Sequence, residues 1–467
     1  MKINRRSFLS GLASGAVAGL LGSLGFKSIT RSKVDSPSSR GRPNFVVIIA
    51  DDMRWDAMGA AGNRIIHTPN LDALAADGTL FVNNFVTTSI CPPSRVSILT
   101  GQYARRHKIW DFATPISSAQ FRLSYPALLR QAGYRTAFVG KWGLGGKLPE
   151  NEFDYWRGFA GQGHYFDATG ERQEHLTDFL SQQATEFLER AGGDKPFCLA
   201  VSSKAPHAQD GDPEPFKPKS KFAHLYERVT MLRPPTATEE HFKRLPPFLQ
   251  DSEGRRRWRK RFSSDELYQY SVKQYYRLIT GLDETVGSIV TQLKKRQLYD
   301  NTCIIFTSDN GFFLGEHGLA GKWWGYEESV RTPLIIKPVE KSTVHRVRAM
   351  TLNIDICPTI QNLAGLPVPK TTHGMSLAPI LSGISKSTRT EWFYEHLFEN
   401  SGIAKSEGMR TERHKYLKYV DRREQGEFLF DLHNDPFEEN NLVGQAKYEP
   451  LLRTMREKLS KMRLKIA

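Results

Sequence analysis

The hydrophobic positions of this chain form two kinds of pattern that alternate along most of its length. Short continuous apolar runs are typical of strands buried on both faces, and they occur at 44–50, 136–140, 197–202, 303–308 and 333–337. Segments with apolar residues three or four positions apart predict helices at 124–132, 175–191 and 265–296. Strands that alternate with helices predict an α/β fold, with a parallel sheet between two layers of helices.

The pattern changes at two places. Residues 203–263 hold many prolines and charges with little periodicity, so we expect a long loop over the carboxyl end of the preceding strand. Ser263 and Glu266 have the spacing of a capping box and predict the start of the helix that follows. After about residue 380, short segments at 392–396, 415–419 and 427–431 predict antiparallel strands, and 448–464 predicts a helix. We therefore expect a main domain over 44–380 and a smaller α+β subdomain over 381–467.

The N-terminus has the pattern of an export signal. Asn4 to Leu9 read N-R-R-S-F-L and precede a mildly apolar, glycine-rich stretch, which is typical of a twin-arginine signal over residues 1–30. Residues 31–43 are polar and predict a linker. A membrane anchor is the alternative, but the stretch is short for one, and no other apolar run is long enough to span. We expect a bacterial protein that the twin-arginine translocase exports to the periplasm or beyond, with no stable membrane span after processing.

Composition and charge narrow the partners. The 467 residues include 65 Lys and Arg against 50 Asp and Glu, and this excess favours sulfated or acidic glycans, nucleic acid or anionic membranes. Residues 255–261 carry the densest basic run, which we expect on a solvated loop, and no nucleic-acid-binding motif accompanies it. The four cysteines form no CxxC pair, so neither a disulfide framework nor a zinc site is expected.

Polar residues follow several of the predicted strands at their carboxyl ends. These residues are Asp51 and Asp52, Lys141, Lys204 to His207, and Asp309 and Asn310. Because sites in open α/β sheets lie outside the carboxyl ends of the strands, we expect these side chains to converge. The two Asp-containing pairs offer hard oxygen ligands, which suit Ca²⁺ or Mg²⁺. Either pair alone would more often belong to a turn.

Cys91 stands in the most unusual segment, which reads C-P-P-S-R-V-S-I-L-T-G from Cys91 to Gly101. Proline disfavours helical geometry in the residue before it, so Cys91 is expected outside the helix. Ser94 would then be the N-cap of a short helix that Gly101 ends. A cysteine at a loop-to-helix junction beside an anion site suggests a nucleophile. A buried cysteine packed behind a proline turn is the alternative.

This segment resembles the signature of the type I sulfatases, C-x-P-S-R before a helix that ends in T-G. Five further segments resemble family motifs in family order: the D-D pair, the D-N pair, Gly140–Gly145 with G-K-W-H-x-G, Pro206-His207 with P-H, and Lys322 with the lysine after D-N-G. The resemblance covers roughly residues 44–445. It implies an alkaline-phosphatase-like fold, with a mixed, mostly parallel sheet and residues 44–380 as the catalytic domain.

The resemblance also implies a function and a set of roles. The chain would be a sulfatase that hydrolyses sulfate monoesters, with a sulfated glycan as its substrate. Cys91 would be oxidised to formylglycine by a formylglycine-generating or sulfatase-maturating enzyme, and the aldehyde hydrate would be the nucleophile. Arg95 would pair with that hydrate, Lys141 would bind sulfate, and His207 and Lys322 would act at the leaving group. One divalent cation, Ca²⁺ or else Mg²⁺, would be held by Asp51, Asp52, Asp309, Asn310 and the modified Cys91.

One position departs from the family pattern. Gly143 stands where the family has a histidine thought to help restore the aldehyde, and His164 is a candidate to replace it. Two other functions therefore remain open. One is hydrolysis of phosphonate monoesters or phosphodiesters, which related enzymes perform with the same nucleophile and metal site. The other is a catalytically weak relative that binds sulfated glycans.

Overall fold

The computed structural model describes residues 41–167, 174–193, 195–386, 389–422 and 426–466. Arg42–Ala467 form one compact unit. The predicted export signal and most of the predicted linker lie outside the described residues. Within the described part, no helix combines the length and apolar character needed to cross a membrane.

The main sheet confirms the predicted α/β fold. Its strands run in the order β11 (Arg346–Leu352), β2 (Thr79–Phe85), β10 (Leu334–Lys337), β6 (Thr302–Ser308), β1 (Asn44–Asp51), β5 (Phe197–Pro206), β3 (Arg135–Lys141) and β4 (Tyr155–Phe159), with β9 (Arg331–Thr332) beside β2. The pairs are parallel except those of β10 and β9, which are antiparallel. The apolar runs predict five of these strands, whereas β2, β4, β9 and β11 lack such a run.

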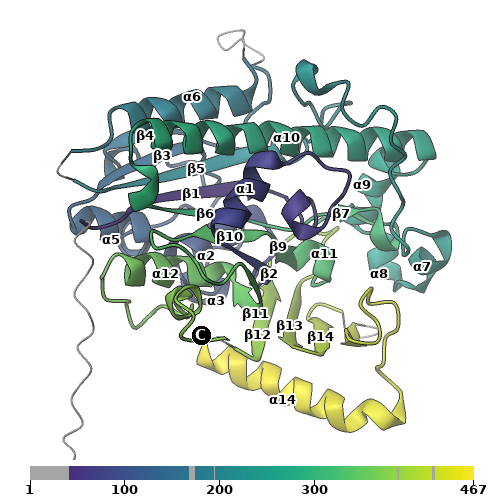
Figure 1. Ribbon diagram of the computed structural model, residues 1–467. Helices are drawn as coiled ribbons and strands as arrows, with labels where there is room; N and C mark the ends of the chain where they lie inside the picture. The colour runs from purple at the N-terminus through teal and green to yellow at the C-terminus, as the bar shows by residue number, and fades with distance from the viewer. Residues whose placement is uncertain (1–40, 168–173, 194, 387–388, 423–425, 467) are drawn as a thin grey trace, which may run out of the picture. The chain divides into compact units, whose positions relative to one another are not determined.

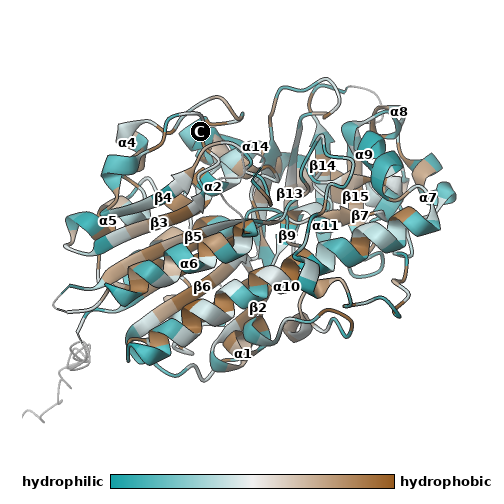
Figure 2. Ribbon diagram, turned by 90° about the horizontal axis from the view of Figure 1, so that it is seen from above, coloured by the Kyte–Doolittle hydropathy of each residue, from teal (hydrophilic) through white to brown (hydrophobic). Residues whose placement is uncertain are grey.

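Helices cover both faces of this sheet (Figure 1). Alternate side chains of β1 point to opposite faces. Val46 and Ile48 pack with α1 (Pro69–Asp77), α6 (Leu176–Glu189) and α10 (Asp265–Lys295). Phe45 and Val47 pack with α2 (Cys91–Thr100), α5 (Tyr125–Gln131) and α12 (Ile356–Leu363). Figure 2 shows α6 and α10 side by side over the strands. The central strands are thus buried on both faces, as their continuous apolar runs predict.

The C-terminal part forms the predicted antiparallel sheet and helix. Its strands are β12 (Glu391–His396), β13 (Ser406–Thr411), β14 (His414–Tyr419) and β15 (Glu427–Asp431), in that order, and α14 (Glu449–Lys465) packs on them (Figure 1). The sequence patterns do not predict β13. Gly408, in the middle of this strand, interrupts the alternation of apolar and polar side chains that would predict it. Glycine is needed there, because a Cβ would lie 2.6 Å from the Tyr416 carbonyl oxygen.

Three expectations about the 203–263 region are wrong. The region is not one loop, because β5 continues to Pro206 and three helices follow: α7 (Glu239–Arg244), α8 (Pro247–Gln250) and α9 (Glu253–Arg261). The basic run lies on α9, and its Arg255 and Arg261 are buried. The Arg255 guanidinium lies 3.6 Å from the Phe242 ring centre, so aromatic contact compensates for part of its burial. The cap of α10 is Ser264, whose hydroxyl accepts from the Leu267 N–H.

The remaining elements are short. They are helices α3 (Ala104–His107), α4 (Ser118–Phe121), α11 (Glu327–Val330) and α13 (Ala378–Leu381), strands β7 (Phe313–Leu314) and β8 (Ala320–Gly321), and 3₁₀ helices at Gly59–Ala61, Glu150–Glu152, Ser220–Phe222, Tyr299–Asn301, Glu316–Gly318, Asn353–Asp355 and Ala446–Tyr448. Strands β7 and β8 pair with each other and lead into Lys322.

A buried ion cluster joins the C-terminal sheet to the main domain. Lys415 Nζ on β14 lies 2.8 Å from a carboxylate oxygen of Glu327 on α11 and 2.8 Å from one of Glu438. Burial raises the pKa of Glu438 to about 7, although Lys415 opposes this. Lys415 therefore separates two buried acidic side chains that would otherwise repel each other.

We expect Lys415→Met to lower the free energy of unfolding by about 3–5 kcal/mol, because it leaves the buried Glu438 carboxylate without its cation, whereas Glu327 keeps its ion pair with Arg410. Urea denaturation of the purified protein measures this change. Lys418→Met is the matched control, because Lys418 is exposed on the same strand. Equal stability of the two variants would contradict the role assigned to the cluster.

Candidate active site

The two acidic pairs lie next to each other at the carboxyl ends of β1 and β6. The strands pair in parallel with Ala50 opposite Ser308, so the residues that follow them meet at one edge of the sheet. The Asp52 N–H donates to Asp309 Oδ1 at 3.2 Å. Asp52 has a φ of 67°, which is uncommon outside glycine. The Tyr275 hydroxyl donates to the Asp52 carbonyl at 2.7 Å and holds this turn in place.

Cys91 lies inside a helix, which corrects the expectation that it precedes one. α2 begins at Cys91, and Pro92 and Pro93 occupy its first turn, where no backbone donor is needed. Ser94 is not a cap; its hydroxyl accepts from Asn353 Nδ2 at 3.0 Å. Gly101 ends the helix with a φ of 70°, as predicted. The helix N-terminus thus brings Cys91 directly to the acidic pairs.

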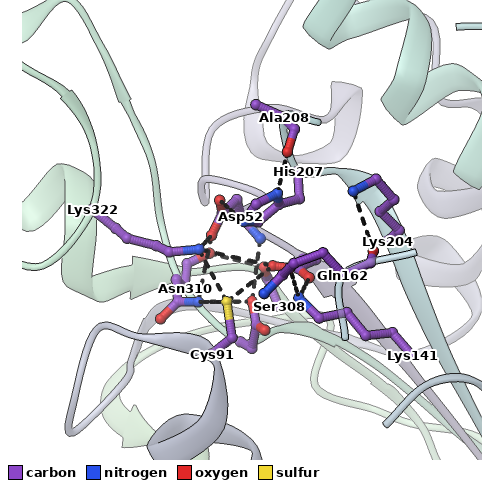
Figure 3. A network of polar contacts seen from close by, with 12 residues as sticks. Asp52, Cys91, Lys141, Gln162, Lys204, His207, Ala208, Ser308, Asn310 and Lys322 are labelled. Atoms are coloured by element: carbon purple, nitrogen blue, oxygen red, sulfur yellow. Dashed lines mark hydrogen bonds and ion pairs between the residues drawn. The ribbon is translucent and has the colours of Figure 1, made fainter. Parts of the chain in front are cut away.

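The Cys91 sulfur is surrounded by charged groups (Figure 3). It lies 3.0 Å from Lys322 Nζ and 3.4 Å from Asp51 Oδ1. Asn310 Nδ2 also points at the sulfur. Burial, together with the charge of Asp51, raises the pKa of the Cys91 thiol to about 12. A thiolate is therefore disfavoured at this position.

Three cations face the carboxylates. Arg95, one turn along α2, places Nε 2.8 Å from Asp309 Oδ2 and Nη2 3.3 Å from Asp51 Oδ2. Lys141, at the end of β3, pairs with Asp51 and donates to Gln162 Oε1 at 2.6 Å. Lys322 Nζ lies 2.5 Å from Asp52 Oδ1. Burial lowers the pKa of Lys322, but the charge of Asp52 outweighs it and holds that pKa above its ordinary value.

His207 completes the group from the end of β5. Its Nε2 lies 3.5 Å from Asp52 Oδ2, and its Nδ1 lies 2.5 Å from the Ala208 carbonyl oxygen. Burial and the charge of Lys322 lower the pKa of His207 well below its usual value. The imidazole is therefore neutral, with its proton on Nδ1 toward the carbonyl and the lone pair of Nε2 toward the site.

Two residues at the site have no assigned role in the sequence analysis. Lys204 Nζ donates to the Gln162 carbonyl at 3.2 Å and lies 5.2 Å from the Tyr165 ring centre. Burial, with the nearby charge of Lys141, lowers the pKa of Lys204 to about 8. Lys204 was within reach of prediction, because it belongs to a polar cluster at a strand end. Gln162 follows β4 in a segment whose pattern carries no signal.

Gly143 lies against the cations of the site. It has a φ of 69°, and a Cβ there would lie 3.2 Å from Arg95 Cδ and 3.3 Å from Lys141 Cε. Glycine thus lets this turn pass close to both side chains. His164, the predicted substitute for the family histidine, is exposed, whereas Arg95 and Lys141 are buried. Its role stays a prediction.

The side chains fit a hard divalent cation. Ligand atoms of Asp51, Asp52, Cys91 and His207 lie within 4.8 Å of one another. Asn310 Oδ1 is buried without a hydrogen-bond partner, so one oxygen ligand is unused. Burial raises the pKa of Asp52 to about 7, an effect that Lys322 opposes and Asp51 reinforces. A cation among these oxygens would remove the electrostatic cost of burying them together.

Comparisons with known proteins give the family of the chain. A family model described as Sulfatase matches residues 43–366, and one described as N-sulphoglucosamine sulphohydrolase, C-terminal, matches 315–465. The chain is 31% identical to an N-acetylglucosamine-6-O-sulfatase of Bacteroides thetaiotaomicron over 87% of this chain and 84% of the relative. It is 29% identical to a choline-sulfatase of Rhizobium meliloti, over 86% and 83%.

A solved structure in complex with D-glucosamine-2-N,6-O-disulfate, described as its substrate, superposes with a TM-score of 0.78. The two chains are 28% identical, and the match covers 91% of this chain and 98% of that one. A phosphonate monoester hydrolase from Silicibacter pomeroyi, 24% identical over 91% and 96%, shares the fold with a TM-score of 0.77.

We expect Gly143→Ala to lower the free energy of unfolding by about 1–2 kcal/mol, because an L side chain is strained at this φ. The new methyl group must also displace Arg95 or Lys141. Thermal and urea unfolding measure the change. The matched control is Gly146→Ala, at an exposed position where a Cβ meets nothing within 4 Å. If both variants have the same free energy of unfolding, glycine at position 143 does not contribute to stability through its close packing.

Proposed function

The chain belongs to the sulfatase family and is a sulfuric ester hydrolase, and we propose that it desulfates a glycan with a formylglycine made from Cys91 and one divalent cation. The observation that carries the proposal is the place of Cys91. Its sulfur lies between Lys322 Nζ and Asp51 Oδ1, where the buried cations meet the buried carboxylates.

The burial of Cys91 bears on how formylglycine would form. The residue is 1% exposed at the start of a helix, so no enzyme could reach it in the folded protein. A formylglycine-generating or sulfatase-maturating partner would therefore act on the unfolded chain, before twin-arginine export of the folded protein. Export to the periplasm or beyond is part of the same proposal.

Asp51, Asp52, Asp309, Asn310 and the modified residue 91 would hold one Ca²⁺ or Mg²⁺. The cation would polarise the sulfate group, and the aldehyde hydrate would supply the nucleophilic oxygen. Arg95 holds the carboxylates of Asp51 and Asp309 in position through its two ion pairs. With the cation bound, the site would offer preorganised positive charge to the non-bridging sulfate oxygens.

The remaining residues divide between the sulfate and the leaving alcohol. Lys141 Nζ provides positive charge on the β3 side of the site. Because its pKa is raised, Lys322 keeps its proton, and it would stabilise the leaving oxygen with a hydrogen bond and its positive charge. Neutral His207 lies on the same side as Lys322, since both contact the Asp52 carboxylate.

Two observations support a glycan substrate. The relative from Bacteroides thetaiotaomicron is named for a 6-O-sulfated amino sugar, and the superposed structure holds a disulfated glucosamine. The net charge of +15 also favours polyanions. Phosphonate monoester hydrolysis is the second candidate, because an enzyme of that activity shares the fold.

We expect Cys91→Ala to lower kcat on N-acetylglucosamine 6-sulfate and 4-nitrophenyl sulfate by more than about a thousandfold, since the nucleophile is lost. The protein is made in a host that can form formylglycine, and sulfate release is measured with Ca²⁺ and with a chelator. Cys198→Ala, at a buried cysteine of β5, is the matched control.

Full activity of Cys91→Ala would refute the proposal. A higher kcat/KM on phenyl phosphonate monoesters than on either sulfate would favour the second candidate instead. Binding of the sulfated sugars without measurable turnover by the modified, metal-loaded protein would favour a glycan-binding relative.

A further inference from the structure

We infer that Arg257 and Arg261 of α9 form a second anion subsite beside the sulfate centre, which selects a sugar carrying another sulfate or a carboxylate. This inference rests on the proposed function. It concerns a part of the molecule that none of the sulfatase motifs includes. Its evidence is the placement and charge of these two arginines and the unused hydrogen-bond donor of Arg261.

The arginine pair is organised by one carboxylate that follows the catalytic strand β5. Asp210 lies three residues after His207. Its Oδ1 accepts from Arg257 Nη1 at 2.9 Å and from Arg261 Nη2 at 3.0 Å. Arg257 Nε also donates to Glu253 Oε1 at 2.8 Å. The carboxylates thus fix both guanidinium groups next to each other.

The cluster keeps an excess of positive charge. Glu253 is shared with Arg256, which lies 2.9 Å from its other oxygen. Three arginines therefore face two carboxylates, Asp210 and Glu253. Burial, with the like charge of Arg257, lowers the pKa of Arg261 to about 10, so the group is still charged at neutral pH. An anion placed here would relieve this repulsion.

Arg261 also has an unsatisfied donor. Its side chain is 5% exposed, and its Nη1 is buried without a hydrogen-bond partner. A buried donor left without a partner is costly, and native proteins rarely keep one without a reason. A sulfate or carboxylate oxygen of a substrate would supply the acceptor. Arg257, with 21% of its side chain exposed, gives such a group access to the pair.

The pair lies on the leaving-group side of the site. The Arg257 guanidinium is 4.8 Å from the ring centre of Trp323, the residue next to Lys322. α9 packs on β8, which leads into Lys322. The charge of Asp52 acts on Arg261, and the charge of Lys322 acts on Asp210. The alcohol that leaves past His207 and Lys322 is the sugar, so a further anionic group on that sugar would reach the pair.

The chemistry favours this class of substituent. A guanidinium matches the planar edge of a carboxylate or two oxygens of a sulfate, and each charge-assisted hydrogen bond is stronger than a neutral one. Neutral sugar hydroxyls would not offset the charge of the pair. We therefore expect the enzyme to prefer substrates that carry a second anionic group near the scissile sulfate. This group would be a second sulfate on the same ring or a neighbouring uronate.

The test compares kcat/KM for glucosamine 6-sulfate, for D-glucosamine-2-N,6-O-disulfate, and for 6-sulfated N-acetylglucosamine with and without a linked uronate. We expect the wild type to prefer at least one extra anion, and Arg257→Gln and Arg261→Gln to lower that preference about tenfold. Arg257→Lys keeps the positive charge but loses the two parallel N–H donors of the guanidinium, so its preference for the extra anion should lie between those of the wild type and Arg257→Gln. Arg259→Gln, at an exposed position of the same helix, is the matched control.

The ratio of kcat/KM with the extra anion to kcat/KM without it distinguishes loss of the subsite from misfolding, because misfolding lowers kcat/KM for both substrates of a pair alike. If the two Gln variants lower the preference for the second sulfate alone, or the preference for the linked uronate alone, that result identifies which anionic group the pair binds. Unchanged ratios in active Arg257→Gln and Arg261→Gln variants would overturn the subsite and leave the sulfatase proposal intact. Absence of sulfate release from every substrate by the wild type would instead count against the proposed function.

Discussion

Three carboxylates buried together at the end of a parallel sheet are the constraint on which this structure depends. Asp51, Asp52 and Asp309 are almost fully shielded from water and would repel one another. Arg95, Lys141 and Lys322 offset that repulsion through direct ion pairs. Under the proposed function, the same balance of charge would hold a cation and bind an anionic substrate, which gives a functional reason for this costly arrangement.

The sheet supplies the geometry for this balance. Strand β1 is central and pairs in parallel with β5 and β6, so residues that follow the three strands come to one edge. Helix α2 then points its first residue, Cys91, at that edge. Lys322 directly follows strand β8, and helix α9, which packs on β8, carries Arg257 and Arg261. Each group lies on a regular element or within two residues of its end, which keeps the site rigid.

Much of this could be read from the sequence, because buried strands and amphipathic helices leave strong periodic patterns. The converging strand ends follow from the topology that such patterns imply, and the structure places the predicted Asp51, Asp309, Lys141 and His207 together. Local rules failed where tertiary contacts outweigh them. The restriction that proline places on the residue before it predicts Cys91 outside α2. In the structure Cys91 begins α2, because prolines are well tolerated in a first helical turn.

The prediction for the basic run at 255–261 is also wrong because tertiary contacts outweigh local sequence. The local sequence predicts a solvated loop for this run, but aromatic rings and acidic partners compensate the charge of its arginines within α9. Such partners lie far away in the sequence and leave no local pattern. Gln162, between Lys141 and Lys204, is hidden for the same reason.

The central claim is that residue 91 acts as formylglycine, and the mass of the peptide that contains it tests this most directly. The chain is made in a host able to carry out the modification, digested and measured intact. The account predicts a peptide lighter by the difference between a thiol-bearing carbon and an aldehyde, and a mass gain on reaction with a hydrazine. An unmodified thiol in protein that is nevertheless fully active would contradict it.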